Sequence, residues 1–238
     1  MKGLKALALS VGGVVALATA VSATPITIDS FNNGGTTLTR TLAGTNTALQ
    51  AGPIADVLGG ARKLSLTNLT GLGDATMRID FMDNNRLSVS NDDDVRSIAS
   101  ILYDQNNAPT GFAPAVDLLS AGFGFSLSRR GDNASGSIII EVTDSDGDTA
   151  TRSISTVSSG VVWVDAFALF SSFTNYSNTD FSSVRTIRLT IDASSVAATA
   201  LDQSIDFFVT SVPEPATFGT LGLALVGLGT LAYRRRKV

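Results

Sequence analysis

The stretch Thr186-Ile187-Arg188-Leu189-Thr190-Ile191-Asp192 decides the fold class, because polar and apolar side chains alternate along it without interruption. A period of two places successive side chains on opposite faces of a strand, one buried and one exposed. The same alternation recurs in short runs between clusters of Gly, Asn, Asp and Ser. The apolar members of these runs are Ile26 and Ile28; Leu64 and Leu66; Met77, Ile79 and Phe81; Leu87 and Val89; Phe123, Phe125 and Leu127; and Ile205, Phe207 and Val209.

Together with the run Ile138-Ile139-Ile140, these segments predict an all-β fold of roughly nine to twelve strands. So many short strands in one domain indicate a two-sheet antiparallel β-sandwich. Two apolar stretches, 95–103 and 161–170, fit either a strand or a short helix. Residues 167–176 are predicted to form a loop that leads into a strand within 180–192.

The N-terminus has the three parts of an export signal. Lys2 and Lys5 precede an apolar region over 6–18, and Val21-Ser22-Ala23 ends it with small residues. This order predicts a signal peptide over 1–23, which signal peptidase removes by cutting between Ala23 and Thr24. A cut after Ala20 fits almost as well.

The C-terminus has a second three-part pattern. Pro213-Glu214-Pro215 is followed by an uncharged run over 216–233 and then by Arg234, Arg235, Arg236 and Lys237. As a helix, the uncharged run measures about 27 Å, enough to span a hydrocarbon core. The four basic residues are expected to stay on the cytoplasmic side as a membrane stop, which places the preceding chain on the far side of the membrane. The two prolines keep the motif extended, and Glu214 supplies a charge.

The domain between these signals, 24–211, is acidic and contains neither His nor Cys. Six of the 17 basic residues lie in the terminal signals and one of the 21 acidic residues is Glu214, which leaves 11 basic and 20 acidic residues and a formal charge of −9. Such a charge argues against a nucleic-acid partner. Without His or Cys, an ordinary Ser-His-Asp triad, a thiol nucleophile and a His-based zinc site are excluded.

A carboxylate pair that includes Glu141 is the remaining catalytic route, but Glu141 fits equally well as a partner for an Arg on a neighbouring strand. The prediction is therefore a protein that is not an enzyme, with no catalytic residue and no cofactor other than a potential Ca²⁺ ion.

The stretch Asp144-Ser145-Asp146-Gly147-Asp148 is the candidate calcium site, because Asp144, Asp146 and Asp148 place oxygen ligands at alternate positions. An EF-hand would require Gly at Thr149 and Glu at Ser155, however, and a hairpin turn between two strands needs no metal. The turn is the favoured interpretation. A second acidic cluster, Asn91-Asp92-Asp93-Asp94, would strengthen the metal hypothesis if both clusters lay at one end of the sandwich.

Two aromatic residues are candidates for stacking on a sugar ring. Trp163 lies in the apolar run Val161-Val162-Trp163-Val164, which favours a place in the core over a binding role. Tyr176, between Asn175 and Ser177, is the better candidate for an exposed ligand contact.

The order of Val212-Pro213-Glu214-Pro215, an apolar segment and an Arg-rich end resembles the PEP-CTERM sorting signal of Gram-negative bacteria, over residues 212–238. The resemblance implies recognition by exosortase, cleavage near the motif, and release or transfer to the cell surface. It also implies a link with exopolysaccharide and biofilm. A simple single-pass anchor, with Pro-Glu-Pro as a spacer, is the alternative.

A second resemblance concerns the domain itself. Ile28-Asp29-Ser30-Phe31, residues 180–189 and Ile205-Asp206-Phe207-Phe208 are similar to strands of galactose-binding-like jelly rolls, which include many carbohydrate-binding modules. The resemblance favours a jelly roll over an immunoglobulin-like sandwich. It bears on the fold more than on the function. A carbohydrate-binding module, with or without Ca²⁺, is one alternative function, and an enzyme that acts on polysaccharide is a second.

Overall fold

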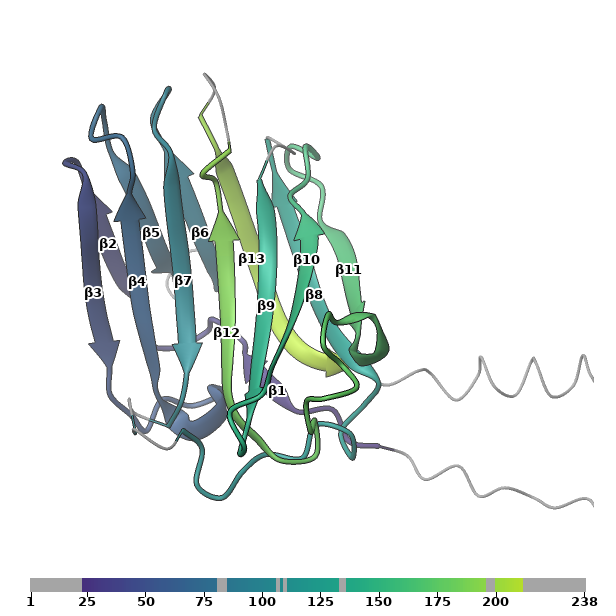
Figure 1. Cartoon of the computed structure of the whole chain (residues 1–238). Coiled ribbons are helices and arrows are strands. Elements are labelled where there is room, and N and C mark those ends of the chain that lie inside the picture. The colour runs from purple at the N-terminus through teal and green to yellow at the C-terminus, as the bar shows by residue number, and fades with distance from the viewer. Residues whose placement is uncertain are drawn as a thin grey trace, which may run out of the picture. The chain divides into compact units, whose positions relative to one another are not determined.

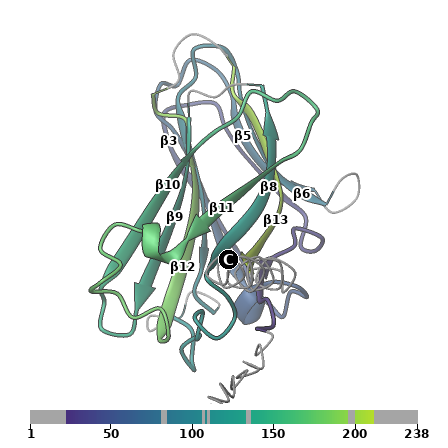
Figure 2. The same ribbon diagram turned by 90° about the vertical axis from the view of Figure 1, so that its right-hand side faces the viewer.

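The computed structural model describes residues 23–80, 85–105, 108, 111–132, 136–195 and 200–211. Two antiparallel sheets pack face to face in this domain (Figures 1 and 2). Sheet A contains β1 (Thr27–Asp29), β2 (Thr36–Arg40), β5 (Ala75–Asp80), β6 (Arg86–Asn91), β8 (Gly124–Gly131), β11 (Val164–Leu169) and β13 (Asp202–Ser211). Sheet B contains β3 (Gly44–Gln50), β4 (Arg62–Asn68), β7 (Ser97–Tyr103), β9 (Ser137–Asp144), β10 (Thr149–Ser155) and β12 (Val184–Asp192). The described helical turns are η1 (Leu58–Gly60) and η2 (Phe170–Ser172).

The strand order identifies a jelly roll. Sheet A runs β11-β8-β13-β6-β5-β2, and sheet B runs β10-β9-β12-β7-β4-β3. The eight strands from β6 to β13 therefore form two interleaved Greek keys. Of the last two strands, β12 lies in the middle of sheet B and β13 in the middle of sheet A. The predicted antiparallel sandwich and its jelly-roll connectivity are confirmed. Strands β2 to β5 extend both sheets on one side.

The core lies between the sheets, where the predicted alternation holds along most strands. Ile187, Leu189 and Ile191 are all buried on β12. On the opposite sheet, Phe125 lies at the centre of an aromatic cluster, 5.1 Å from the ring of Phe170 and 5.0 Å from that of Phe208. Edge-on and tilted contacts of this kind add to the stabilisation that burial provides.

The alternation predicted for β13 is wrong in its second half. The pairing of β13 with β8 shifts register between Ile205 and Phe208, which exchanges the two faces of the strand. Phe208 and Thr210 are buried as a result, whereas Phe207 and Val209 are only half-buried. A bulge of this kind depends on pairing with a distant strand, so the local pattern did not reveal it.

The two ambiguous stretches form mainly strands. Residues 97–103 are β7, and 164–169 are β11, so the loop predicted for 167–176 is wrong over its first three residues. Strand β11 pairs with β8 and forms an edge of sheet A, followed by the single helical turn η2. Strands β2 and β3 were not predicted, because their Thr-rich sequences have few large apolar residues.

A buried ion pair joins the two sheets at one end. Arg62 on β4 donates from Nη1 to Oδ2 of Asp29 on β1 at 2.5 Å, and both side chains are fully buried. The Tyr103 hydroxyl on β7 donates to the same Oδ2 at 3.0 Å, and the Phe31 backbone N–H donates to Oδ1 at 2.8 Å. Arg62 also donates from Nε to Gln50 Oε1 at 2.6 Å. This cluster fixes the first strand to sheet B.

Burial determines the protonation of this cluster. It raises the pKa of the Asp29 carboxyl, an effect that the Arg62 guanidinium opposes. Burial, with the neighbouring Asp29 carboxylate, raises the pKa of the Tyr103 phenol well above its usual value. Tyr103 therefore remains a neutral donor to Asp29.

Candidate functional site

Trp163 lies at the surface, so its predicted place in the core is wrong. It is half-buried, and the two preceding residues, Val161 and Val162, are 82% and 62% exposed. Strand β11 begins only at Val164, and the residues before it form a turn beside the end of β8. The apolar run from Val161 to Val164 therefore lies at the surface of the domain and not in its core.

Backbone hydrogen bonds fix this turn in place. The N–H groups of Ser159 and Gly160 both donate to the carbonyl of Gly131, at 2.7 and 2.8 Å. Gly160 has φ +58, a left-handed conformation that favours glycine. The turn brings the indole of Trp163 to Arg130, whose guanidinium carbon lies 4.7 Å from the ring centroid in a cation–π contact.

A row of polar side chains extends from Arg130 across the outer face of sheet A. Arg130 on β8 pairs with Ser204 on β13, which pairs with Ser88 on β6. The hydroxyls of Ser88 and Ser204 are 3.2 Å apart, and Nε of Arg86 donates to Ser88 Oγ at 3.1 Å. These four side chains line a hollow of about 380 Å³. We call this group, with Trp163, the Trp163 site.

The Trp163 site contains two positive charges, those of Arg86 and Arg130, and a carboxyl group lies near Arg130. Asp206, half-buried on β13, has its pKa raised by burial, and the positive charge of Arg130 opposes this shift. The site thus combines guanidinium and hydroxyl donors with an indole ring, and the residues that line the hollow also include Asp132 and Asp202. Sugars offer matching groups, because their hydroxyls exchange hydrogen bonds and their apolar ring faces stack on aromatic rings.

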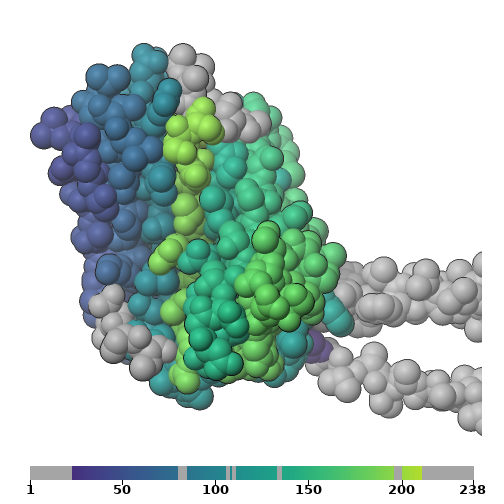
Figure 3. All heavy atoms as spheres, in the orientation of Figure 1, coloured from purple at the N-terminus to yellow at the C-terminus, as the bar shows by residue number. Residues whose placement is uncertain are grey.

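Figure 3 views the domain from the side of sheet B, whose outer face has no aromatic residue comparable to Trp163 in its hollow. A second hollow of about 400 Å³ lies across β3, β4, β7 and β12, and its lining includes Lys63, Ser100 and Arg188 but no aromatic residue. Arg188 forms an ion pair with Glu141 on the neighbouring strand β9 at 3.1 Å. This is the structural role that the sequence offered as the alternative to catalysis for Glu141.

The Asp144 side chain accepts backbone hydrogen bonds that stabilise the hairpin turn between β9 and β10. Its Oδ1 accepts from the backbone N–H groups of Asp146 and Asp148, both at 2.9 Å, and its Oδ2 accepts from that of Asp180 at 2.8 Å. Among the described residues, no group of three or more His, Cys, Asp or Glu side chains is placed to hold a metal ion. The proposed ligand set Asp144, Asp146 and Asp148 stays a prediction.

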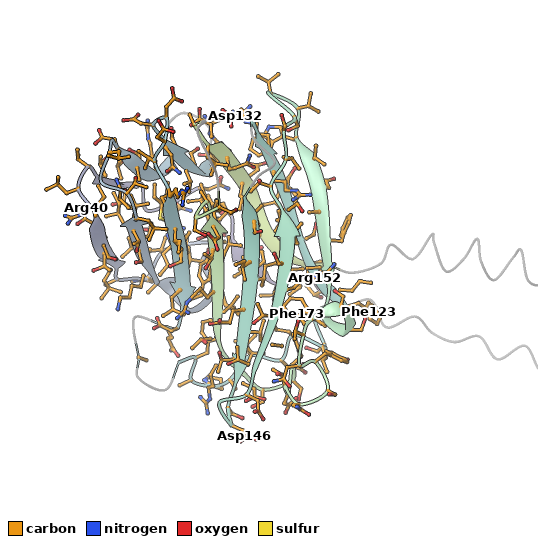
Figure 4. All side chains as sticks on the ribbon, turned by 45° about the horizontal axis from the view of Figure 1, so that its top comes forward. Arg40, Phe123, Asp132, Asp146, Arg152 and Phe173 are labelled. Carbon is orange, nitrogen blue, oxygen red and sulfur yellow. The ribbon has the colours of Figure 1, made fainter. Side chains whose placement is uncertain are left out.

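The two acidic clusters lie at opposite ends of the sandwich. On β12, Val184 pairs with Asp144 at one end, and Asp192 pairs with Ile98, near the Asn91–Asp94 cluster, at the other. Figure 4 shows Asp146 at the end opposite Asp132. The condition that would have strengthened the metal hypothesis is therefore not met.

Tyr176 is exposed, as predicted, but lies apart from Trp163. Its ring packs 5.5 Å from that of Phe181, beside the aromatic cluster that follows β11. Trp163 precedes β11, so the length of that strand separates the two aromatic residues. They do not form one site.

Most of the predicted terminal signals lie outside the described residues, including residues 1–22, Pro213, Glu214, Pro215, the 216–233 run and the basic tail. In the part of the chain that the structure describes, no helix has the length and apolar character needed to cross a bilayer. Ala23 and Thr24 precede β1 without regular secondary structure.

Residues 211–237 match the family model of the PEP-CTERM protein-sorting motif. The match covers the segment in which Pro-Glu-Pro, the apolar run and the basic tail were recognised, and it confirms that resemblance. The chain thus carries the sorting motif of exported proteins that exosortase processes at the membrane. No curated protein matches the sequence of this chain.

Several solved structures are similar to the domain at low sequence identity. The family 11 carbohydrate-binding module of the cellulosomal cellulase Lic26A-Cel5E of Clostridium thermocellum is 10% identical, with a TM-score of 0.38 over 82% of this chain and 99% of that chain. An agarase, AgWH50C, is 15% identical with a TM-score of 0.42, over 63% of this chain and only 22% of the agarase. A module in complex with β-1,4-galactotriose, TmCBM61, is 13% identical with a TM-score of 0.33, over 52% of this chain and 68% of that chain. At such identities a shared ligand does not follow.

Proposed function

We propose that this chain is an exported protein of the cell surface or extracellular matrix, which exosortase cuts near Pro213-Glu214-Pro215 after the 216–233 run has held it in the inner membrane. The match of residues 211–237 to the sorting motif carries the proposal. The jelly roll is then the mature part that works outside a Gram-negative cell, among exopolysaccharide and biofilm material. No catalytic residue is part of the proposal.

Each part of the tail has a role in this scheme. The prolines keep the motif extended for the protease, because they fix φ and remove two backbone donors. Glu214 offers a negative charge to a basic pocket. Arg234, Arg235, Arg236 and Lys237 hold the orientation until the cut is made. The signal peptide, removed between Ala23 and Thr24 by signal peptidase, starts the export.

The test replaces the motif in the native host and follows the mature protein. Glu214→Gln and the double change Pro213→Ala/Pro215→Ala should leave uncut precursor in the membrane fraction. A matched control, Thr220→Ser, alters the apolar run and leaves the motif intact, so it should be processed normally. Unchanged mature mass and unchanged release in both motif variants would refute the proposal.

A second candidate function is glycan binding, and the Trp163 site favours it. An indole beside a guanidinium, with serine hydroxyls and a carboxylate nearby, offers the contacts that a sugar ring uses. Trp163 is the only tryptophan of the chain, so intrinsic fluorescence reports on this site directly. Purified protein from the medium should change its emission on addition of the host's own polysaccharide.

Two variants sharpen the glycan test. Arg130→Ala should weaken binding, whereas Tyr176→Ala, which removes an exposed aromatic ring far from Trp163, should leave it unchanged. Repeating the titration with and without Ca²⁺ tests whether glycan binding requires the ion. If the polysaccharide leaves the emission unchanged at every concentration, the Trp163 site is not a glycan site.

A further inference from the structure

Exposed apolar side chains gather around the end of β13, where the chain leaves the domain. Phe123, Phe167 and Leu169 are 58%, 62% and 54% exposed, and Leu119 is also exposed. We call these four residues the exit rim. Exposed apolar surfaces of this kind mark sites that contact a partner or a membrane.

Strand pairing places the rim beside the last residue of β13. Ser211 pairs with Gly124, and Gly124 pairs with Leu169 on β11. With neighbouring strands about 4.8 Å apart, Leu169 lies about 10 Å from Ser211. Gly124 lies between these two residues and has no side chain. A Cβ at this position would lie only 2.4 Å from the carbonyl oxygen of Ala168, so the close approach of the strands requires glycine.

Hydrogen bonds hold the other half of the rim at the same place. The hydroxyl of Thr210 on β13 donates to the carbonyl of Ala121 at 3.0 Å, which ties the segment between Leu119 and Phe123 to the strand end. The N–H of Phe170 donates to the carbonyl of Phe123 at 2.9 Å, which joins that segment to the end of β11. Figure 4 shows Phe123 on this side of the domain, far from Arg40.

The short connection between β13 and the apolar run indicates which partner contacts the exit rim. Four residues lie between Ser211 and Ala216, where the apolar run begins, and a fully extended chain between these two residues spans at most about 17 Å. If residues 216–233 anchor the chain in the membrane, the end of β13 lies within about 17 Å of the start of the anchor, and the exit rim lies close to the lipid headgroups. Aromatic and aliphatic side chains at such a boundary partition into the interface.

We infer that the exit rim rests on the phospholipid surface while the precursor is anchored, and so fixes the orientation in which the Pro-Glu-Pro segment is offered for cleavage. This inference rests on the proposed membrane anchor. It adds a lipid-binding role for Leu119, Phe123, Phe167 and Leu169 that the sorting motif itself does not contain. After cleavage the tether is lost, and the rim no longer holds the domain at the membrane.

The chain has no Cys, so single labels can be placed without background. Full-length Phe167→Cys carries an environment-sensitive fluorophore and is reconstituted into vesicles of phosphatidylethanolamine and phosphatidylglycerol that contain a shallow nitroxide-labelled lipid. The matched control is Leu72→Cys, an equally apolar and 73% exposed position. Leu72 lies near Ala75, at the end where β13 begins, about 30 Å away along the strand.

The label at Phe167 should be quenched several-fold more strongly than the label at Leu72. An alkaline carbonate wash of the vesicles reports on the anchor separately. If the wash retains the protein and both labels are quenched equally weakly, the rim inference is wrong and the anchor stands. If the wash releases the protein, both the anchor and the inference are wrong.

A processing assay in the host separates lipid from a protein partner. The triple change Phe123→Ser/Phe167→Ser/Leu169→Ser should slow the appearance of mature protein, whereas Leu42→Ser/Leu72→Ser should not. Slow processing combined with an unquenched Phe167 label would show that the rim contacts the protease instead of lipid, and would overturn the inference.

Discussion

Two arginines of this jelly roll, Arg62 and Arg130, show how differently one fold can use the same side chain. Arg62 is fully buried, and its guanidinium donates to Asp29, Gln50 and the backbone carbonyls of the loop after β1. Arg130 lies on the outer face of sheet A against the ring of Trp163. All of these partners of Arg62 lie inside the protein, whereas Arg130 lines a hollow at the surface. The comparison predicts that changes at Arg62 and its partners affect stability and that changes at Arg130 and Trp163 affect binding.

The largest expected effect is on the buried pair. Asp29→Ala leaves the Arg62 guanidinium charged and buried without its carboxylate, so we expect a loss of about 3–5 kcal/mol in the free energy of unfolding. Urea denaturation of the mature domain measures it. The double change Asp29→Leu/Arg62→Met removes both charges and should recover most of the loss. A loss below about 1 kcal/mol in the single variant would contradict the assigned role.

Tyr103→Phe tests the same cluster more gently. It removes one hydrogen bond to Asp29, which should cost about 1–2 kcal/mol at neutral pH. Because the folded-state pKa of Tyr103 is raised, its stabilisation is complete below the unfolded pKa of about 10 and declines as the pH rises toward the folded value. The wild-type protein should therefore lose stability above about pH 10 more steeply than the variant. The free energy of unfolding of both proteins is measured by urea denaturation at several alkaline pH values. If it falls with pH equally steeply in the wild type and the variant, the pKa of Tyr103 is not raised by folding.

Trp163→Ala should separate binding from folding. We expect the free energy of unfolding to change by less than about 1 kcal/mol, since an exposed cation–π contact is worth little. Affinity for the polysaccharide should fall by about tenfold, or about 1.4 kcal/mol. Retention of the variant on immobilised polysaccharide measures this. Destabilisation as large as that of Asp29→Ala would place Trp163 with the core after all.

The smallest effect is expected for the exposed pair on sheet B. Arg188→Gln removes the ion pair with Glu141, in which both side chains are partly exposed to water. Such pairs contribute about 0–1 kcal/mol, and salt screens them. Thermal unfolding at low and high salt should show a difference only at low salt. A strong effect in both conditions would mean that the pair is desolvated.

The sequence predicted the fold well because burial on a sheet follows a local period of two. Ile187, Leu189 and Ile191 were assigned to the core from that period alone, and the jelly roll followed from the strand pattern together with a family resemblance. Strands β2 and β3 were missed because they have few large apolar residues, whereas two other failures depend on a partner strand far away in the chain. The bulge after Ile205 comes from pairing with β8, and the exposure of Trp163 comes from the late start of β11.

The candidate site was predicted only in part for the same reason. Trp163 was identified as a potential ligand contact, but Arg130 lies 33 residues earlier and becomes its neighbour through the pairing of β8 with β11. Asp29 and Arg62 give no sign of burial in the sequence, because each adjoins an ordinary alternating run. The sorting motif was predicted more completely, since its three parts are contiguous in the chain and need no fold to bring them together.

The intact mass of the protein from the culture medium and from the cell envelope tests the central claim most directly. The account predicts a mature chain that begins at Thr24, or at Val21 for the alternative cut, and ends near Pro213-Glu214-Pro215, with or without an attached group. Surface or shed protein that retains Arg234 to Val238 would contradict it.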